Sequence, residues 1–348
     1  MPNKKITVQD IANELGISRN TVSKALNNTG SLAEATKLRI IQKAIELGYK
    51  QFAYMNSSSI DASKTVNKDI ALLTCSMPNS SHFGSKLLSD FEKKISNEGY
   101  RLSIYMIREN EINSLSLPVN FNVESIDGII CIEMFDENYS KFICDLGIPT
   151  LFIDSSYNEN AFPLEADILL MESYQSVYNI TKSLIDNNKN KLAFVGDIYH
   201  CQSFYERWNG YRNALLDSNI PINSNNSILE KDDQPYGDIK WLGDKIAQLP
   251  VLPDAFICAN DFIAIDVIKA LKHNNLSIPN DVLVCGFDDS AESKIIEPHL
   301  TTVYIPSFEM GDIAADLLLS RIENPSIPFR TTHVRTSIKY RSSTGNIK

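Results

Sequence analysis

The part of the sequence best suited to chemistry is a run of hydrogen-bonding side chains at residues 18–27. Ser18 stands where a short helix should begin, and the outward face of that helix would hold two cations, three neutral hydrogen-bonding groups and no acid. Such a face suits base edges and phosphates. The alternative is the solvated face of an ordinary helix pair, but those faces usually mix both charge signs. The outward residues are Arg19, Asn20, Ser23, Lys24 and Asn27.

Two predicted helices would position this face. Thr7 stands at a helix start, Asp10 follows at capping-box spacing, and Ile6 and Ile11 occupy the positions of a hydrophobic staple. Gly16 supplies the break before the second helix. Each helix has an apolar inner face, so the pattern predicts two short helices joined by a glycine turn. These faces are Ile11, Ala12 and Leu15 in the first helix and Val22, Ala25 and Leu26 in the second.

A third helix is predicted over 31–48. Ser31 and Glu34 are spaced as a capping box, and four apolar residues recur with helical periodicity. This helix would close a small three-helix domain over residues 1–50. Its inner residues are Ile40, Ile41, Ala44 and Leu47.

Charge is unevenly divided along the chain. The whole chain has a net charge of −10, whereas residues 1–60 hold eight Lys or Arg against four Asp or Glu, so that segment is +4 and residues 61–348 are −14. A basic head on an acidic body fits a polyanion-binding module whose larger part is repelled by the same polyanion. Charge alone also allows a chance fluctuation in a short segment.

Composition limits the class of protein. With 348 residues, 43% hydrophobic and 22% charged, the chain is an ordinary globular one, too long for a single core. It has no membrane-length apolar tract and no signal-peptide core in residues 1–30, so we expect a cytoplasmic protein. The six cysteines show no CxxC spacing and no histidine at metal-ligand spacing, which predicts reduced thiols, no metal site and no cofactor.

The N-terminal pattern resembles a known family. The run TVQDIANELGISRNTVSKALN at 7–27, followed by LRIIQKAIELGY at 38–49, is similar to the headpiece of the lactose-repressor/galactose-repressor (LacI/GalR) family of bacterial transcription regulators. The resemblance implies an all-α helix-turn-helix headpiece that binds double-stranded operator DNA. We expect Arg19 and Asn20, early in the second helix, to make the base contacts. The full set of expected DNA-binding residues is Thr7, Ser18, Arg19, Asn20, Thr21, Ser23, Lys24 and Asn27.

From residue 69 onward, short apolar runs alternate with amphipathic segments. This alternation predicts parallel sheets flanked by helices, and the length indicates two such layers, with ligands expected at the carboxyl ends of the strands. Predicted helices include 83–96, 175–185, 205–216 and 263–272. Predicted strands are 70–74, 102–106, 128–132, 150–153, 168–171, 192–195, 255–258 and 282–285.

Fragments of this part also resemble the family, including ERWNGYRNAL, CANDFIAIDVIKAL and LSIPNDVLVCGFDDS. They imply an α/β periplasmic-binding-protein-like core of two parallel-sheet subdomains. We expect an effector-binding and dimerisation core over 69–345. Its N-subdomain would comprise about 69–166 and 304–334, and its C-subdomain about 167–303 and 335–345.

The same resemblance implies a small-molecule effector site, most commonly for sugars in this family. Asp288 matches a carboxylate that binds effector hydroxyls, and Arg207, Asn260 and Asp154 match neighbouring polar groups. His82 and Phe83 fall in a loop where an aromatic ring often stacks on a sugar. Other interpretations stay open: Asp288 as a helix cap, Arg207 as a surface ion-pair partner, Phe83 as core and His82 as merely exposed. Trp208 could stack on a ligand or lie under its helix.

Residues 51–68 are expected to be a hinge or linker. The leucine that the family inserts into the minor groove is replaced here by serine, so Phe52, Tyr54 and Met55 are candidate substitutes. Packing of these three residues on the third helix is an equally good interpretation.

Catalysis is not expected. Asp288 with Asp289 is the best paired-carboxylate candidate, but adjacent residues seldom point together and no nucleophile–base set is visible. The sequence therefore predicts an operator-binding homodimer, a repressor controlled by a sugar-like effector. The chain stops without a leucine-heptad tail, so no tetramer is expected. A small-molecule binding protein without a regulatory role is the alternative.

Overall fold

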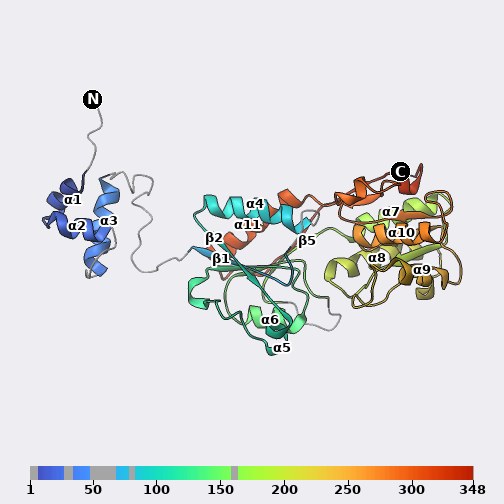
Figure 1. Ribbon diagram of the computed structural model, residues 1–348, viewed down its shortest axis with the longest axis horizontal. Coiled ribbons are helices and arrows are strands. Elements are labelled where there is room, and N and C mark those ends of the chain that lie inside the picture. Colours follow the sequence, from blue (N-terminus) through green and yellow to red (C-terminus); the bar gives the residue numbers. More distant parts are fainter. Residues whose placement is uncertain (1–6, 27–33, 48–67, 78–82, 158–163, 348) are drawn as a thin grey trace, which may run out of the picture. The chain divides into compact units, whose positions relative to one another are not determined.

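The structure is a computed structural model that describes residues 7–26, 34–47, 68–77, 83–157 and 164–347 (Figure 1). The chain divides into two compact units, residues 1–66 and residues 67–348. We call the first unit the headpiece and the second the core, and each is described by itself. The expected hinge residues Phe52, Tyr54 and Met55 lie outside the described residues.

The headpiece is built from α1 (Val8–Leu15), α2 (Arg19–Leu26) and α3 (Glu34–Glu46). The third helix was predicted over 31–48; its described part ends at Glu46, with Leu47 in a turn, and its expected cap Ser31 lies outside the described residues. Each helix is too short to be stable alone in water, so the shared apolar centre must hold the three together. Its buried residues are Ile11, Ala12, Val22, Ala25, Ile40 and Ala44.

The turn between α1 and α2 follows the predicted chemistry. Thr7 Oγ1 accepts a hydrogen bond from the Asp10 amide (3.3 Å), and Asp10 Oδ2 accepts one from the Thr7 amide (2.8 Å), which completes the capping box. Gly16 ends the helix with a φ of 66°, a conformation in which a side chain would be strained. Ser18 Oγ then accepts from the Thr21 amide (3.1 Å) at the start of α2.

The first lobe of the core contains a six-stranded parallel sheet in the order β10-β5-β4-β3-β1-β2. α4 (Phe83–Asn97) and α11 (Ser307–Glu323) pack together on one face, and α5 (Glu109–Ser114) and α6 (Glu137–Cys144) lie on the other (Figure 1). The strands are β1 (Asp69–Thr74), β2 (Arg101–Met106), β3 (Gly128–Ile132), β4 (Thr150–Ile153), β5 (Asp167–Met171) and β10 (Thr331–Val334).

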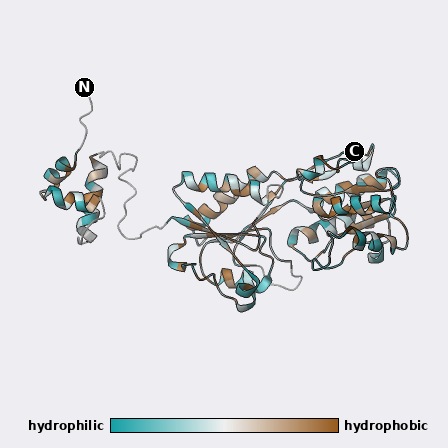
Figure 2. Ribbon diagram, in the orientation of Figure 1, coloured by the Kyte–Doolittle hydropathy of each residue, from teal (hydrophilic) through white to brown (hydrophobic). Residues whose placement is uncertain are grey.

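The central strands explain why their sequences read as continuous apolar runs. Every residue of β1, β3 and β4 is buried, because helices cover both faces of the sheet. Figure 2 shows hydrophobic residues concentrated in these strands and in the helices beside them. β2, at the edge, is only partly buried.

The second lobe has the parallel sheet β6-β7-β8, with β6 (Leu192–Val195), β7 (Ala255–Cys258) and β8 (Leu283–Cys285). Its helices are α7 (Tyr174–Asp186), α8 (Gln202–Asp217), α9 (Ile239–Ala247) and α10 (Asp261–His273). An antiparallel ribbon of β9 (Thr302–Tyr304) and β11 (Ser337–Lys339) adjoins this lobe. Short 3-10 turns occupy Val123–Ser125, Ser224–Asn226, Glu292–Lys294 and Ser342–Thr344.

The predicted α/β core of two parallel sheets is confirmed, and the eight predicted strands end within one residue of their observed limits. The boundary expected between residues 166 and 167 needs correction. β5 pairs with β4 in the first lobe, so the chain crosses to the second lobe only after Met171. The apolar sequence of a strand indicates that the strand is buried, but it does not indicate which sheet the strand joins. The polar strands β9, β10 and β11 were not predicted.

A buried ion cluster fixes the end of the first lobe. Asp167 at the start of β5 accepts hydrogen bonds from Arg321 Nη2 (2.9 Å) and from Arg330 Nη2 (2.8 Å) and its backbone amide (2.7 Å). Burial alone would raise the pKa of Asp167, but the hydrogen bonds from Arg330 and Arg321 outweigh burial and lower it. The carboxylate thereby joins α11 and the start of β10 to β5.

Replacing Asp167 with asparagine should destabilise the core by about 3–5 kcal/mol, because it leaves two guanidinium groups without their buried carboxylate. Urea unfolding followed by circular dichroism measures this. Asp186→Asn is the control, since Asp186 pairs with Lys182 in an exposed position (59% exposed). A loss for Asp167→Asn no larger than that for the control would contradict the assignment. The stabilisation by Asp167 should also decrease as pH falls below the ordinary pKa of an aspartate. The carboxylate of the unfolded chain is protonated there, whereas that of the folded chain, whose pKa is lower, still has to be protonated at a more acidic pH.

Candidate functional site

The exposed face of α2 presents the polar residues that the sequence singled out. Ser18, Arg19, Asn20 and Lys24 are exposed, while Val22 on the opposite face is buried. Thr21 and Ser23 are half-buried, and the Thr21 hydroxyl lies 2.8 Å from Ser18 Oγ. Asn27 lies outside the described residues. Two exposed cations with an amide and a hydroxyl, on a helix whose other face is anchored in a core, form a surface that can hydrogen-bond to bases and phosphates.

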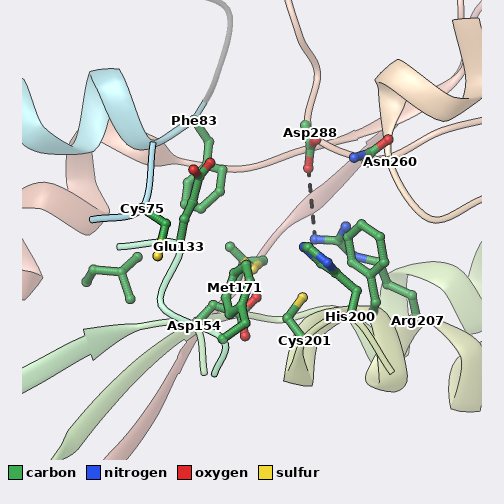
Figure 3. Close-up of a pocket in the computed structure, with 13 residues that line it drawn as sticks. Cys75, Phe83, Glu133, Asp154, Met171, His200, Cys201, Arg207, Asn260 and Asp288 are labelled. Carbon is green, nitrogen blue, oxygen red and sulfur yellow. Dashed lines mark ion pairs between the residues drawn. The ribbon is translucent and has the colours of Figure 1, made fainter. Parts of the chain in front are cut away.

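The core contains a cavity of about 320 Å³ between its two lobes, which we call the cleft. The carboxyl ends of both parallel sheets face it, and three of its residues, Cys75, Glu133 and Asp154, directly follow strands. Figure 3 shows side chains of the two lobes converging on the space between them. The cleft is lined by Cys75, Phe83, Glu133, Phe135, Ile153, Asp154, Met171, His200, Cys201, Phe204, Arg207, Asn260 and Asp288.

Arg207 on α8 is the central cation of the cleft. It is 3% exposed, and its guanidinium lies 3.7 Å from the centre of the Phe287 ring. Nη1 donates to the Ala259 carbonyl (2.6 Å), and Nη2 lies 3.9 Å from Asp288 Oδ1. Nε is buried without a hydrogen-bond partner. A buried donor of this kind needs an acceptor, which a bound molecule can supply.

Asn260 and Asp288 stand beside this guanidinium. Asn260 Oδ1 caps α10 by accepting from the Ile263 amide (2.9 Å), which leaves its Nδ2 turned toward the cleft (Figure 3). Asp288 follows β8 with a φ of 121°, a strained conformation for a residue with a side chain. Its amide donates to the Val303 carbonyl (2.9 Å), which helps to hold that conformation.

A second carboxylate lies behind Asp288. Asp261 has no exposed surface and accepts hydrogen bonds from Thr302 Oγ1 (2.5 Å) and the Ser290 amide (2.8 Å). Burial, and after it the nearby charge of Asp288, raises the pKa of Asp261 to about 7. Asp261 thus supports the loop that carries Asp288 without lining the cleft.

Asp154 is engaged by the protein itself. Its Oδ1 accepts from the Ser155 amide (2.8 Å) and, across the cleft, from the Ser203 amide (3.3 Å) in the first turn of α8. The Gln202 amide donates to the Ser155 carbonyl (2.9 Å) beside it. A residue of the first lobe therefore caps a helix of the second.

The remaining walls are aromatic and apolar. Phe83 and Phe135 come from the first lobe, and Phe204 from the second. The His200 ring lies 4.8 Å from each of Phe135 and Phe204, and its Nδ1 pairs with Asp232. These rings can cover the apolar faces of a small ring-shaped ligand.

The structure brings together five of the seven residues expected at the effector site: Phe83, Asp154, Arg207, Asn260 and Asp288. His82 lies outside the described residues. Trp208 does not line the cleft and is corrected: it packs on Phe194, 5.6 Å between ring centres. Successive helical residues point about 100° apart, so a helix that turns Arg207 to the cleft turns Trp208 to the sheet.

Other cleft residues were not anticipated, chiefly Cys75, Glu133, Phe135, His200 and Phe204. Cys75 and Glu133 directly follow predicted strands, a position that could have identified them. All six cysteines are free thiols. Within the described ranges, no group of three His, Cys, Asp or Glu side chains could hold a metal ion, and no helix is long and apolar enough to cross a membrane.

The sequence matches two family models: "Bacterial regulatory proteins, lacI family" over residues 7–51 and "Periplasmic binding protein-like domain" over residues 181–344. The HTH-type transcriptional repressor PurR of Vibrio parahaemolyticus is 27% identical, covering 97% of this chain and 98% of the relative. A CelR–cellobiose complex has a TM-score of 0.69 at 21% identity, covering 97% and 100%. A lac repressor dimer bound to operator and an anti-inducer has 0.67 at 18%, covering 98% and 99%.

A helix-turn-helix headpiece joined to a two-lobed core with an interlobe cleft defines a DNA-binding transcriptional regulator. The headpiece of this chain matches the lacI family of bacterial regulatory proteins, and part of its core matches a periplasmic binding protein-like domain. Regulators of this family bind operator DNA and small-molecule effectors. The expectation of a regulator, not an enzyme or a binding protein without a regulatory role, is confirmed by relatives that are transcriptional repressors.

Stability of the core should depend on the protonation of Asp261. A carboxyl group whose folded pKa is raised binds its proton more tightly in the folded chain, so stability is greatest at low pH and falls as pH rises toward the folded pKa. We expect a loss of up to about 1 kcal/mol per pH unit between pH 5 and 7. Asp261→Asn should flatten this slope in thermal unfolding at pH 5, 6 and 7. Asp186→Asn should retain it, and an unchanged slope in Asp261→Asn would refute the role of Asp261.

Proposed function

We propose that this protein represses transcription by binding a near-palindromic operator as a homodimer, and that a small sugar-like effector in the cleft controls this binding. The main support for an effector site is the buried Nε of Arg207, a hydrogen-bond donor that has no acceptor in the protein. The carboxylate of Asp288 and the amide of Asn260 line the cleft with it. Such a set matches a molecule with neighbouring hydroxyl groups, since each hydroxyl can accept from Arg207 and donate to Asp288.

The headpiece supplies the DNA-binding surface in this proposal. Arg19 and Asn20, exposed at the start of α2, make the base contacts, because an arginine can bond both acceptors of guanine and an asparagine can pair with adenine. Lys24, Ser18, Ser23 and Asn27 contact bases or backbone, Thr21 belongs to the same DNA-binding set, and Thr7 with the first-turn amides of α1 binds phosphate. The protein acts in the cytoplasm, where bacterial operators lie.

Dimerisation follows from the small size of this surface. One headpiece contacts too few base pairs for useful affinity, whereas two linked headpieces gain effective concentration and read a symmetric site. The lac repressor structure that shares this fold is a dimer on operator DNA.

The cleft suits a ligand of sugar size and chemistry. Its volume of about 320 Å³ is at the lower end of the range for small-molecule sites. Aromatic rings line it from both lobes, and the polar groups of Arg207, Asn260 and Asp288 gather at its second-lobe side, an arrangement that holds a ring by its hydroxyls and its faces. One solved structure with this fold contains cellobiose and another contains ribose, which supports the same class of effector here.

Arg19→Ala combined with Asn20→Ala should abolish sequence preference in a randomised-oligonucleotide selection, because each well-formed base contact contributes about 1–3 kcal/mol of discrimination. Arg39→Ala is the control: it removes the same charge from an exposed position on α3 and should weaken binding to all sequences alike. Circular dichroism verifies that each headpiece is folded. Enrichment of the same operator by the double variant would exclude Arg19 and Asn20 as base contacts.

Asp288→Asn should weaken binding of neutral monosaccharides and disaccharides by at least tenfold, because hydrogen bonds to a charged acceptor are worth about 1.5–3 kcal/mol. Operator binding without a ligand should be unchanged. Isothermal titration of the full chain with ribose, glucose, galactose and cellobiose measures the effect, with Asp186→Asn as control. If no sugar binds the wild-type chain, the sugar-like class is wrong; if one binds both chains equally, Asp288 is not a ligand contact.

A further inference from the structure

The second lobe contains another cavity, of about 330 Å³ and therefore close to the cleft in volume. We call it the distal cavity. A concave, mostly apolar space of this size with a few polar groups has the general form of a small-molecule site. Its apolar walls include Leu192, Tyr211, Leu215, Ile220, Val251 and Pro253.

The distal cavity lies at the opposite end of the sheet from the cleft. Pro253 precedes β7 and lines the distal cavity, whereas Asn260 follows β7 and lines the cleft. Along α8, Arg207 lines the cleft, and Tyr211 and Leu215, one and two helical turns later, line the distal cavity. Among the described residues the two cavities share no lining residue, so a molecule in one leaves the contacts of the other free.

The apolar wall of the distal cavity is well defined. Tyr211 is 3% exposed, and its hydroxyl donates to the Leu192 carbonyl (2.9 Å), so the protein satisfies this polar group itself and the ring acts as an apolar surface. Burial raises the pKa of Tyr211, which keeps the hydroxyl uncharged. Val251 is 52% exposed in this wall, and a ligand that covers it removes apolar surface from water.

The polar lining of the distal cavity consists of one cation and three amides. In the part of the chain that the structure describes, Lys191 is the charged residue of this lining, and no carboxylate belongs to it. The Lys191 ammonium makes no hydrogen bond or ion pair with a described residue. Asn223 Oδ1 accepts from the Asn225 amide (3.0 Å), which leaves Nδ2 to donate to a ligand. The other two amides belong to Asn190 and Asn226.

The carboxylate beside Lys191 in the fold is engaged by the backbone. Asp254 Oδ2 accepts from the amides of Asn190 (3.0 Å) and Lys191 (2.9 Å), and the Asp254 amide donates to the Lys191 carbonyl (2.6 Å). These bonds join the chain before β6 to the chain before β7. Because Asp254 is used in this way and lies outside the lining, the ammonium of Lys191 is available to an anionic ligand.

We propose that the distal cavity is a second ligand site, which binds a small organic acid with an apolar ring or branched chain. The apolar part lies against Tyr211 and Val251, and the carboxylate accepts hydrogen bonds from Lys191 and Asn223. An inorganic anion would leave the apolar wall exposed to water, and a neutral ring would leave Lys191 without a counter-charge. The proposal concerns a cavity separate from the cleft, so its failure would leave the proposed function unchanged.

The test is isothermal titration of the full chain with benzoate, phenylacetate and isovalerate, with the neutral amide of each acid, and with inorganic phosphate. At least one acid should bind about threefold or more tightly than its amide, the factor expected for an ion pair that stays partly solvated. Phosphate should bind more weakly than that acid, because it covers no apolar surface. Binding by none of the acids, amides that bind as well as their acids, or equally tight binding of phosphate overturns the proposal.

Two variants assign this binding to the distal cavity. Lys191→Gln should lower the affinity for the acid to that for its amide, and Val251→Asp should abolish it, because the new carboxylate repels the ligand. Lys240→Gln is the matched control, since it removes the same charge from an exposed position on α9 outside both cavities. Wild-type affinity for the acid in either Lys191→Gln or Val251→Asp overturns the proposal, and thermal unfolding verifies that all three variants are folded.

Discussion

Parallel strand pairing is the constraint on which the core depends. Because the strands of each lobe's main sheet run in one direction, all of their carboxyl ends meet at one edge of the sheet. Residues far apart in the sequence, such as Cys75, Glu133, Asn260 and Asp288, are thereby brought to the same cleft. Buried hydrophobic strands fix where these ends lie, and the loops that follow are free to carry polar groups.

The burial of Arg207 shows how the second lobe keeps a cation inside. Its guanidinium is compensated by the Ala259 carbonyl and by the face of Phe287. Asp288 lies at 3.9 Å, beyond a direct hydrogen bond, and Nε has no acceptor. The site is therefore rigid but incomplete in its hydrogen bonding, which is the condition for binding a polar molecule with selectivity.

The sequence predicted the elements well and the contacts unevenly. Hydrophobic periodicity, helix caps and turn glycines depend on residues that are neighbours in the sequence. The sequence could therefore predict α1, its capping box at Thr7 and the central strands without knowledge of how they pack. Membership of a sheet is not local, which is why β5 was assigned to the wrong lobe.

The cleft could be predicted to the same extent. Resemblance located Arg207 and Asp288, since these residues belong to recognisable fragments. Glu133 has no such fragment, and the capping role of Asp154 depends on how two lobes meet. Trp208 was ambiguous because its direction on α8 depends on the orientation of the whole helix.

The cap that Asp154 and Ser155 place on α8 has a consequence for the resting state of the core. The first amides of a helix need acceptors, and here two of them, on Gln202 and Ser203, find theirs in the other lobe. Separating the lobes would return both amides to water, so the protein has an intrinsic preference for the joined arrangement even before any ligand arrives. An effector therefore acts on an equilibrium between joined and separated lobes that these backbone hydrogen bonds already bias. A modest difference in its binding free energy between the two arrangements suffices to shift that equilibrium.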